Sequence, residues 1–146
     1  MKKNKNFYTE KEISKYWKEK SYLIDWFKKP TKIIDNYNFY QDGITNIAYN
    51  CIRKNILNGN GNKRAIIFID EKNKIIELNF IQLENLVDHF IQYLFKNFSK
   101  KELFKNVITI HSSANIVSTV SMLACAKLGI THCVLFDELS EEAIRI

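Results

Sequence analysis

The sequence predicts an α/β fold, in which an irregular and partly helical N-terminal extension precedes the start of a parallel sheet. From about Asn79 onward, segments typical of helices and of strands alternate along the chain. Such alternation favours parallel strands joined by helical crossovers. Before Arg64 there is no such alternation, and the chain is rich in Asn, Tyr and Lys. The change in character divides the chain into an extension, residues 1–62, and an incomplete α/β domain, residues 63–146.

The extension opens with a helix signal from Thr9 to Lys20. Thr9 and Glu12 have the spacing of a capping box, in which each side chain bonds the backbone N–H of the other residue. Pro30, the only proline of the chain, disfavours helix at that point. The polar stretch Thr31–Gly43 is expected to be irregular, and Asn46–Leu57 returns to a helical pattern. Aromatic side chains of the extension are interpreted as holding it onto the rest of the protein; they are Trp17, Tyr22, Trp26 and Phe27.

The α/β domain shows a different pattern, with short apolar runs and one long amphipathic segment. Small residues in the segment Ile116–Leu128 would let a helix lie close to its neighbours, and Gly129 suits the left-handed residue that ends such a helix. The expected elements are a hairpin of Ala65–Ile69 and Lys74–Leu78, a helix from Asn79, strands Val107–Ile110 and Ile130–Phe136 around the helix Ile116–Leu128, and a last helix opened by Ser140.

Composition narrows the class of protein. The chain has 146 residues, 46% hydrophobic and 26% charged, which is typical of a globular protein. Its net charge of +6 invites a nucleic-acid interpretation. That interpretation is disfavoured because only three of the 22 basic residues are arginines, and the densest cluster is Lys2, Lys3 and Lys5 near the terminus. No apolar stretch resembles a signal peptide or a membrane span, so we expect a cytoplasmic protein with no membrane partner.

Few residues of the sequence are candidates for a metal site or a phosphate-binding loop. Cys51, Cys125 and Cys133 lack metal-ligand spacing, and no metal site is predicted. The turn Ile110–Asn115 between a strand and a helix holds no glycine, so it is not a phosphate-binding loop. The Asn-Gly repeat at residues 58–62 precedes a strand and is interpreted as a surface turn.

Three further features have competing interpretations. His111 ends a strand, where open α/β sheets bind ligands; it either faces a substrate or bonds a loop carbonyl, and the structural role is favoured. Ser112 and Ser113 are interpreted as candidates for helix capping, as is Asn115, and not as nucleophiles. His89 and His132 are interpreted as structural, and Asp137 with Glu138 as a solvated loop. No catalytic residue is predicted.

Four segments, in order, resemble the N-terminal region of the AMP-forming acetyl-CoA synthetases, members of the adenylate-forming superfamily. They are Tyr16-Trp17 with Ile24–Lys28, the run Asn46–Ile52 (NIAYNCI), Arg64–Ile69 with Leu78–Leu83, and Met122–Gly129 (MLACAKLG). The resemblance implies a short-chain acyl-CoA synthetase that joins acetate or propionate to CoA with ATP and Mg²⁺. The groups that bind ATP and the carboxylate, and the catalytic lysine, would lie beyond residue 146. The chain alone would then be inactive; the alternative is a non-catalytic module that binds CoA or regulates a synthetase.

One ligand-contacting segment of that family maps onto this chain. The resemblance aligns Phe136–Ser140 (FDELS) with the family run F-G-G-F-S, which lies against the CoA nucleotide. Phe136 and Ser140 match, so Phe136 is the predicted CoA contact. Asp137 and Glu138 replace the two glycines, and their carboxylates would repel the CoA phosphates.

Overall fold

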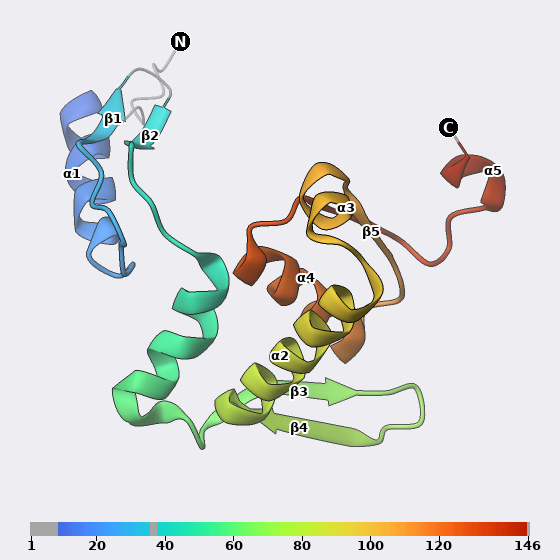
Figure 1. Ribbon diagram of the computed structural model, residues 1–146. Coiled ribbons are helices and arrows are strands. Elements are labelled where there is room, and N and C mark those ends of the chain that lie inside the picture. The colour runs from blue at the N-terminus through green and yellow to red at the C-terminus, as the bar shows by residue number, and fades with distance from the viewer. Residues whose placement is uncertain (1–8, 36–37, 146) are drawn as a thin grey trace, which may run out of the picture. The chain divides into compact units, whose positions relative to one another are not determined.

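The computed structural model describes residues 9–35 and 38–145, and it separates into two compact units, Met1–Thr45 and Asn46–Ile146 (Figure 1). The division falls earlier than the expected boundary between residues 62 and 63, because the helical segment after Asn46 packs with the α/β elements that follow it. The lysine cluster at residues 2–5 lies outside the described residues. Each unit is described by itself below.

The first unit combines one helix with a small hairpin. Helix α1 (Glu10–Ser21) has the predicted capping box: the Glu12 N–H donates to Thr9 Oγ1 at 3.3 Å, and the Thr9 N–H donates to Glu12 Oε2 at 2.8 Å. The Glu12 carboxylate accepts hydrogen bonds from the Thr9 backbone N–H and from the Thr9 hydroxyl, and these lower the pKa of the Glu12 carboxyl. Strands β1 (Lys32–Asp35) and β2 (Asn38–Gln41) pair antiparallel. The expectation of an irregular segment over Thr31–Gly43 is therefore wrong for both strands.

An aromatic cluster joins the hairpin to α1. The ring of Trp17 meets those of Phe39 and Tyr40 edge to face, with centroids 5.4 and 6.4 Å apart, and Tyr40 also packs on Trp26 at 5.1 Å. The Tyr40 hydroxyl donates to the carbonyl of Trp17 at 3.0 Å, and partial burial raises the pKa of Tyr40. The rings of Trp17 and Trp26 thus pack against the hairpin and stabilise the first unit, whereas the side chains of Tyr22 and Phe27 are mostly exposed.

The second unit begins with a helical segment that contains two π-helical stretches, η1 (Tyr49–Arg53) and η2 (Ile56–Asn60). The predicted helix is confirmed. Helical structure runs on to Asn60 but is broken at Gly59, whose backbone is left-handed (φ 78°), so the turn predicted within residues 58–62 is present at that glycine. Strands β3 (Arg64–Ile69) and β4 (Ile75–Asn79) form the predicted antiparallel hairpin, with Ile67 opposite Glu77.

The remaining elements confirm the predicted alternation and add one helix. They are α2 (Phe80–Asn97), α3 (Lys100–Lys105), β5 (Ile108–His111), α4 (Ile116–Leu128), β6 (His132–Leu135) and α5 (Glu141–Ile144). Strands β5 and β6 pair in parallel, with Thr109 opposite Cys133. Helix α3 was not predicted; it is capped by Ser99 and Glu102, and hydrogen bonds to Ser99 lower the pKa of the Glu102 carboxyl. No helix of the described residues is long and apolar enough to span a membrane.

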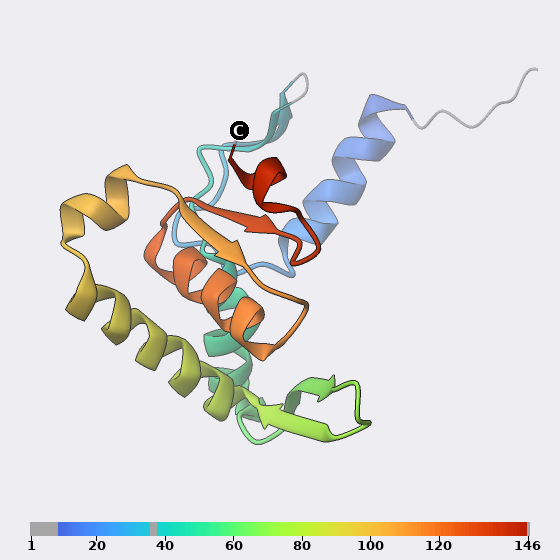
Figure 2. The same ribbon diagram turned by 90° about the vertical axis from the view of Figure 1, so that its right-hand side faces the viewer.

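The core of the second unit lies around α4. In Figure 2 this helix lies between α2 and the β5–β6 pair, and it contacts both. Val87 of α2 and Ala124 and Cys125 of α4 are completely buried. Leu83, Ile52 and Val120 extend one side of this core, and Leu94, Leu103 and Ile130 form its other side with Cys125. The small side chains of α4 make this close packing possible.

We expect Leu83→Ala to lower the free energy of unfolding by about 3 kcal/mol, because it removes a buried side chain from this core and leaves a cavity. Leu86→Ala on the same helix is the matched control, since Leu86 is exposed, and it should cost less than about 1 kcal/mol. Urea unfolding of both variants measures the difference. Equal losses would contradict the assignment of the core.

Candidate ligand groove at the ends of the parallel strands

A groove of about 360 Å³ opens where β5 and β6 end. In open α/β sheets, ligands bind outside the carboxyl ends of the parallel strands, which is where this groove lies. Its walls come from β3, from the β5–α4 turn, from the first turns of α4 and from the end of β6. The lining residues that carry the argument are Phe68, Ser112, Ser113, Asn115, Met122 and Phe136. None of the residues lining the groove is ionisable.

The β5–α4 turn is held by one asparagine. Asn115 caps α4: its Oδ1 accepts from the N–H of Ser118 at 2.9 Å. Its Nδ2 donates to Ser112 Oγ at 2.9 Å and to Ser113 Oγ at 3.2 Å. Of the three candidate caps, Asn115 is therefore the cap, and the two serines accept from its amide. Their hydroxyls are engaged in forming the turn, which agrees with a structural role.

The histidines and cysteines are distributed over several elements. His111 ends β5 and is exposed, His89 is exposed on α2, and His132 is half-buried in β6. Cys51 and Cys133 are exposed, whereas burial raises the pKa of the Cys125 thiol and so favours its neutral, unreactive form. No three His, Cys, Asp or Glu side chains among the described residues are placed to hold a metal ion. The groove is suited to binding through apolar contact and neutral hydrogen bonds.

The predicted contact residue, Phe136, lies on the rim of the groove with 78% of its surface exposed. The N–H of Leu139 donates to the Phe136 carbonyl at 3.2 Å, which closes a turn with Asp137 and Glu138 at its centre. Both carboxylates are exposed, and neither residue has a positive φ. Ser140 caps α5, as its predicted position at the start of that helix implies. This turn thus places negative charge beside the neutral groove.

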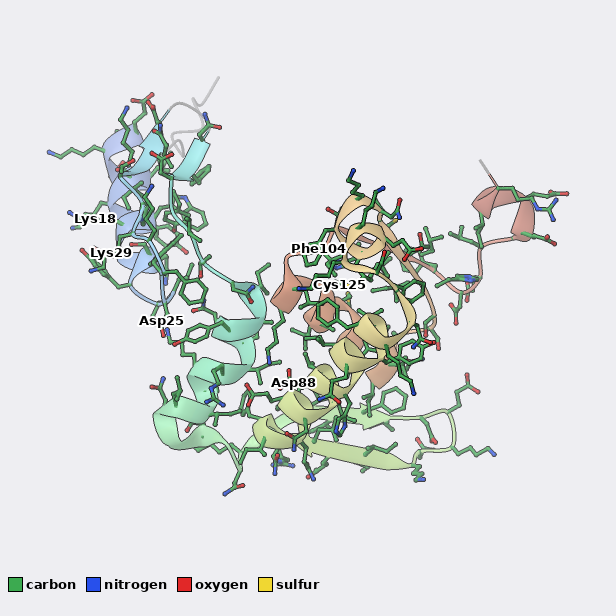
Figure 3. The ribbon with its side chains drawn as sticks, in the orientation of Figure 1. Lys18, Asp25, Lys29, Asp88, Phe104 and Cys125 are labelled. Atoms are coloured by element: carbon green, nitrogen blue, oxygen red, sulfur yellow. The ribbon has the colours of Figure 1, made fainter. Side chains whose placement is uncertain are left out.

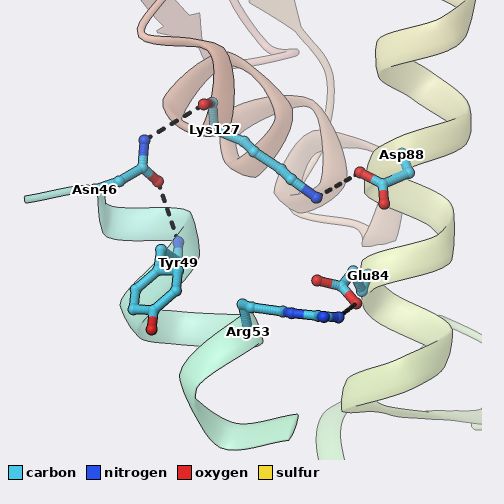
Figure 4. A network of polar contacts seen from close by, with 6 residues as sticks. All are labelled: Asn46, Tyr49, Arg53, Glu84, Asp88 and Lys127. Atoms are coloured by element: carbon cyan, nitrogen blue, oxygen red, sulfur yellow. Dashed lines mark hydrogen bonds and ion pairs between the residues drawn. The ribbon is translucent and has the colours of Figure 1, made fainter. Parts of the chain in front are cut away.

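A second polar network, which the sequence did not reveal, fastens α4 to its neighbours (Figure 4). Asn46 Nδ2 donates to the carbonyl of Ala126 at 2.8 Å, and Asn46 Oδ1 accepts from the N–H of Tyr49 at 3.1 Å. One amide side chain therefore caps the start of one helix and the end of another, where carbonyls lack helical partners. Ion pairs continue the network from Lys127 to Asp88 (2.5 Å) and from Arg53 to Glu84 (3.1 Å).

Comparisons with known proteins show which family the chain belongs to. The family described as "Acetyl-coenzyme A synthetase N-terminus" matches residues 7–51. The acetyl-coenzyme A synthetase of Cupriavidus necator is 30% identical over 128 residues, which cover 84% of this chain and 19% of that enzyme. The acetyl-coenzyme A synthetase of Bartonella quintana is 33% identical over 138 residues, with 88% and 20% covered. The chain is homologous to the N-terminal region of the acetyl-coenzyme A synthetases. It spans about a fifth of the length of the curated relatives it matches.

Solved structures support the fold alone. Acetoacetyl-CoA synthetase from Streptomyces lividans superimposes with a TM-score of 0.74 at 12% identity, over 92% of this chain and 21% of that one. CmiS6 superimposes with a TM-score of 0.58 at 19% identity, over 68% of this chain and 23% of that one. The predicted α/β fold with its small parallel sheet is thereby confirmed. Two of the segments that carry the sequence resemblance, Asn46–Ile52 and Met122–Gly129, meet in the Asn46 network.

We expect Asn46→Asp to destabilise the chain by about 1–2 kcal/mol at neutral pH, because it removes a donor and sets a carboxylate against the negative end of α4. The control is Asn55→Ala, which should cost less, since the Asn55 amide donates to the Cys51 carbonyl within its own helix and does not join two helices. Thermal and urea unfolding of both variants measure the effect. A larger loss in Asn55→Ala would refute the capping role of Asn46.

Proposed function

We propose that this chain forms the N-terminal part of a short-chain acyl-CoA synthetase that activates acetate or propionate. The observation that carries the proposal is the 30–33% identity to acetyl-coenzyme A synthetases along 84–88% of the chain. In such a reaction the carboxylate attacks the α-phosphorus of ATP, which forms an acyl-adenylate and releases pyrophosphate. The thiolate of CoA then attacks the acyl carbon, which forms the thioester and releases AMP.

The part played by this chain is to build one wall of the enzyme and the groove beside it. Adenylate formation needs cations, such as Mg²⁺ and basic side chains, to neutralise the reacting phosphates. The groove supplies none, because no ionisable residue lines it. The reacting phosphates of ATP, with Mg²⁺ and the carboxylate, would therefore not be held by this groove, and we expect the chain alone not to catalyse the first step.

Within that enzyme we assign the CoA contact to Phe136. Its exposed ring on the rim of the neutral groove offers a surface on which the adenine ring of CoA can stack. Asp137 and Glu138, next to it, would weaken the binding of the CoA phosphates by charge repulsion. CoA binding would thus combine a favourable contact with the Phe136 ring and an unfavourable repulsion between the two carboxylates and the CoA phosphates.

A non-catalytic module is the second candidate, and one observation favours it. The second unit has its own packed core, in which the side chains of Val87, Ala124 and Cys125 are completely buried. Every buried side-chain N and O atom among the described residues has a hydrogen-bond partner. Such a unit has the internal packing needed to bind a ligand without further catalytic domains.

A chimaeric enzyme tests the proposed function. Residues 1–146 replace the matching N-terminal region of the Cupriavidus necator acetyl-coenzyme A synthetase, and acetate-dependent exchange between ATP and pyrophosphate is measured. We expect exchange by the chimaera and none by the chain alone. A folded, monodisperse chimaera without exchange would contradict the proposal, as would exchange by the chain alone. The affinity of the chain alone for CoA, measured by direct titration, tests the second candidate. Tight binding of CoA by the chain, together with an inactive chimaera, would favour a non-catalytic module.

The same chimaera tests the CoA contact. Phe136→Ala should raise the KM for CoA several-fold while the KM for acetate changes little, because the ring would touch only the thiol substrate. Replacing Asp137 and Glu138 by glycine should lower the KM for CoA, because two repulsive charges are removed. An unchanged KM for CoA in both variants would remove Phe136 from the binding site.

A further inference from the structure

A second hollow, of about 440 Å³, lies in the first unit and shares no residue with the groove described above. It is formed by the end of α1, the turn that follows and the start of β1. Lys18 and Lys29 stand at its edge, Tyr22 and Trp26 line it, and Asp25 adds one carboxylate. Figure 3 shows Lys18, Lys29 and Asp25 projecting from this part of the chain. We propose that the hollow binds a nucleoside phosphate.

The charges of the hollow suit an anionic group. Neither Lys18 nor Lys29 makes an ion pair with another described residue, and both are exposed. Because both lysines line the hollow, their ammonium groups can donate charge-assisted hydrogen bonds to a phosphate bound there. The surrounding field has the same sign, since residues 1–45 carry ten lysines against six acidic residues. The phosphate is therefore assigned to the edge held by Lys18 and Lys29.

The end of α1 would oppose an anion if its carbonyls were free, but they are engaged. The Ser21 carbonyl accepts from Trp26 Nε1 at 2.9 Å, and the Glu19 and Lys20 carbonyls accept from the N–H groups of the following turn. The negative end of the helix dipole is thereby partly offset. A phosphate at the lysine edge then meets little repulsion from the helix.

The walls suit a flat ring. Tyr22 is 73% exposed, and with the half-buried Trp26 and Pro30 it offers an aromatic and apolar surface on which a base can stack. The volume of about 440 Å³ lies within the range of small-molecule sites, about 300–1,000 Å³. The phosphate and the base of the ligand therefore each have a matching group in the hollow.

The walls are also fixed before a ligand arrives. The Trp26 ring packs on Tyr40 with centroids 5.1 Å apart, and an added Cβ at Gly43 would come within 2.7 Å of Trp26 Cζ3. The Phe27 N–H donates to the Ile44 carbonyl at 2.8 Å, and Thr45 Oγ1 donates to the Asp25 carbonyl at 2.8 Å. A preformed wall lowers the ordering cost of binding. The proposal stands on these contacts and is independent of the proposed function.

Fluorescence of Trp26 tests the site directly. Trp17→Phe leaves Trp26 as the only tryptophan, and ADP is the probe. We expect saturable quenching with a Kd below about 1 mM. Replacing both Lys18 and Lys29 by Ala should weaken binding about tenfold or more. The matched control replaces Lys11 and Lys15, exposed lysines of α1 that do not line the hollow, and should change the Kd less than about twofold.

Further probes separate the sources of binding. Inorganic phosphate should bind at least about tenfold more weakly than ADP, because it lacks the ring that stacks. A single-stranded oligonucleotide distinguishes a free nucleotide from a nucleic-acid strand: binding that is tighter than that of ADP and equally sensitive to Lys11 and Lys15 would overturn the proposal. So would no quenching by ADP at about 1 mM, or equal losses in the two lysine pairs. Far-UV circular dichroism confirms that each variant is folded.

Discussion

The close contact between α2 and α4 is the constraint on which the second unit depends. It requires small side chains on α4, where Ala124 and Cys125 are completely buried against an α2 face that contains the equally buried Val87. A larger residue at position 124 would push the helices apart, because packed interiors have no room to absorb added volume. Since β5 precedes α4 and β6 follows it, the position of this helix also sets where the two parallel strands begin and end. The groove at their ends is a consequence of that packing.

Polar contacts fix the ends of the same helix. At its start, Asn115 caps α4 and holds Ser112 and Ser113 in the wall of the groove. At its end, Gly129 has φ 71°, which turns the chain toward β6, and Asn46 bonds the Ala126 carbonyl. These contacts join two segments that the sequence comparison with acetyl-coenzyme A synthetases had marked separately. We infer that such segments are shared because they hold α4 in place.

Local signals predicted much of the fold. The bounds of α4 were predicted correctly because a capping residue and a glycine mark its two ends, and the β3–β4 hairpin was predicted from its apolar runs. The β1–β2 hairpin was missed because each strand has only four residues, and the hairpin is held by contacts of Phe39 and Tyr40 with Trp17 on another element. Helix α3 was missed although Ser99 and Glu102 carry the capping-box spacing that identified α1.

Less of the candidate site than of the fold could be predicted from the sequence. The position of Phe136 after a strand was enough to place it at the edge of the sheet, and Asn115 could be named as one of three caps. The partners of Asn46 could not be found, because Ala126 lies eighty residues away in the sequence. The hollow of the first unit likewise depends on how a helix end, a turn and a strand come together. The signal that could have pointed to Asn46 is its place as an asparagine immediately before a helical pattern.

Amide hydrogen exchange tests the central role of the α2–α4 contact most directly. If that contact holds the second unit together, the amides of Val87, Ala124 and Cys125 exchange slowest, and they exchange only through global unfolding. The amides of the β3–β4 hairpin, whose outer face is exposed, should exchange faster through local opening. Exchange in α4 as fast as in the hairpin would contradict the account.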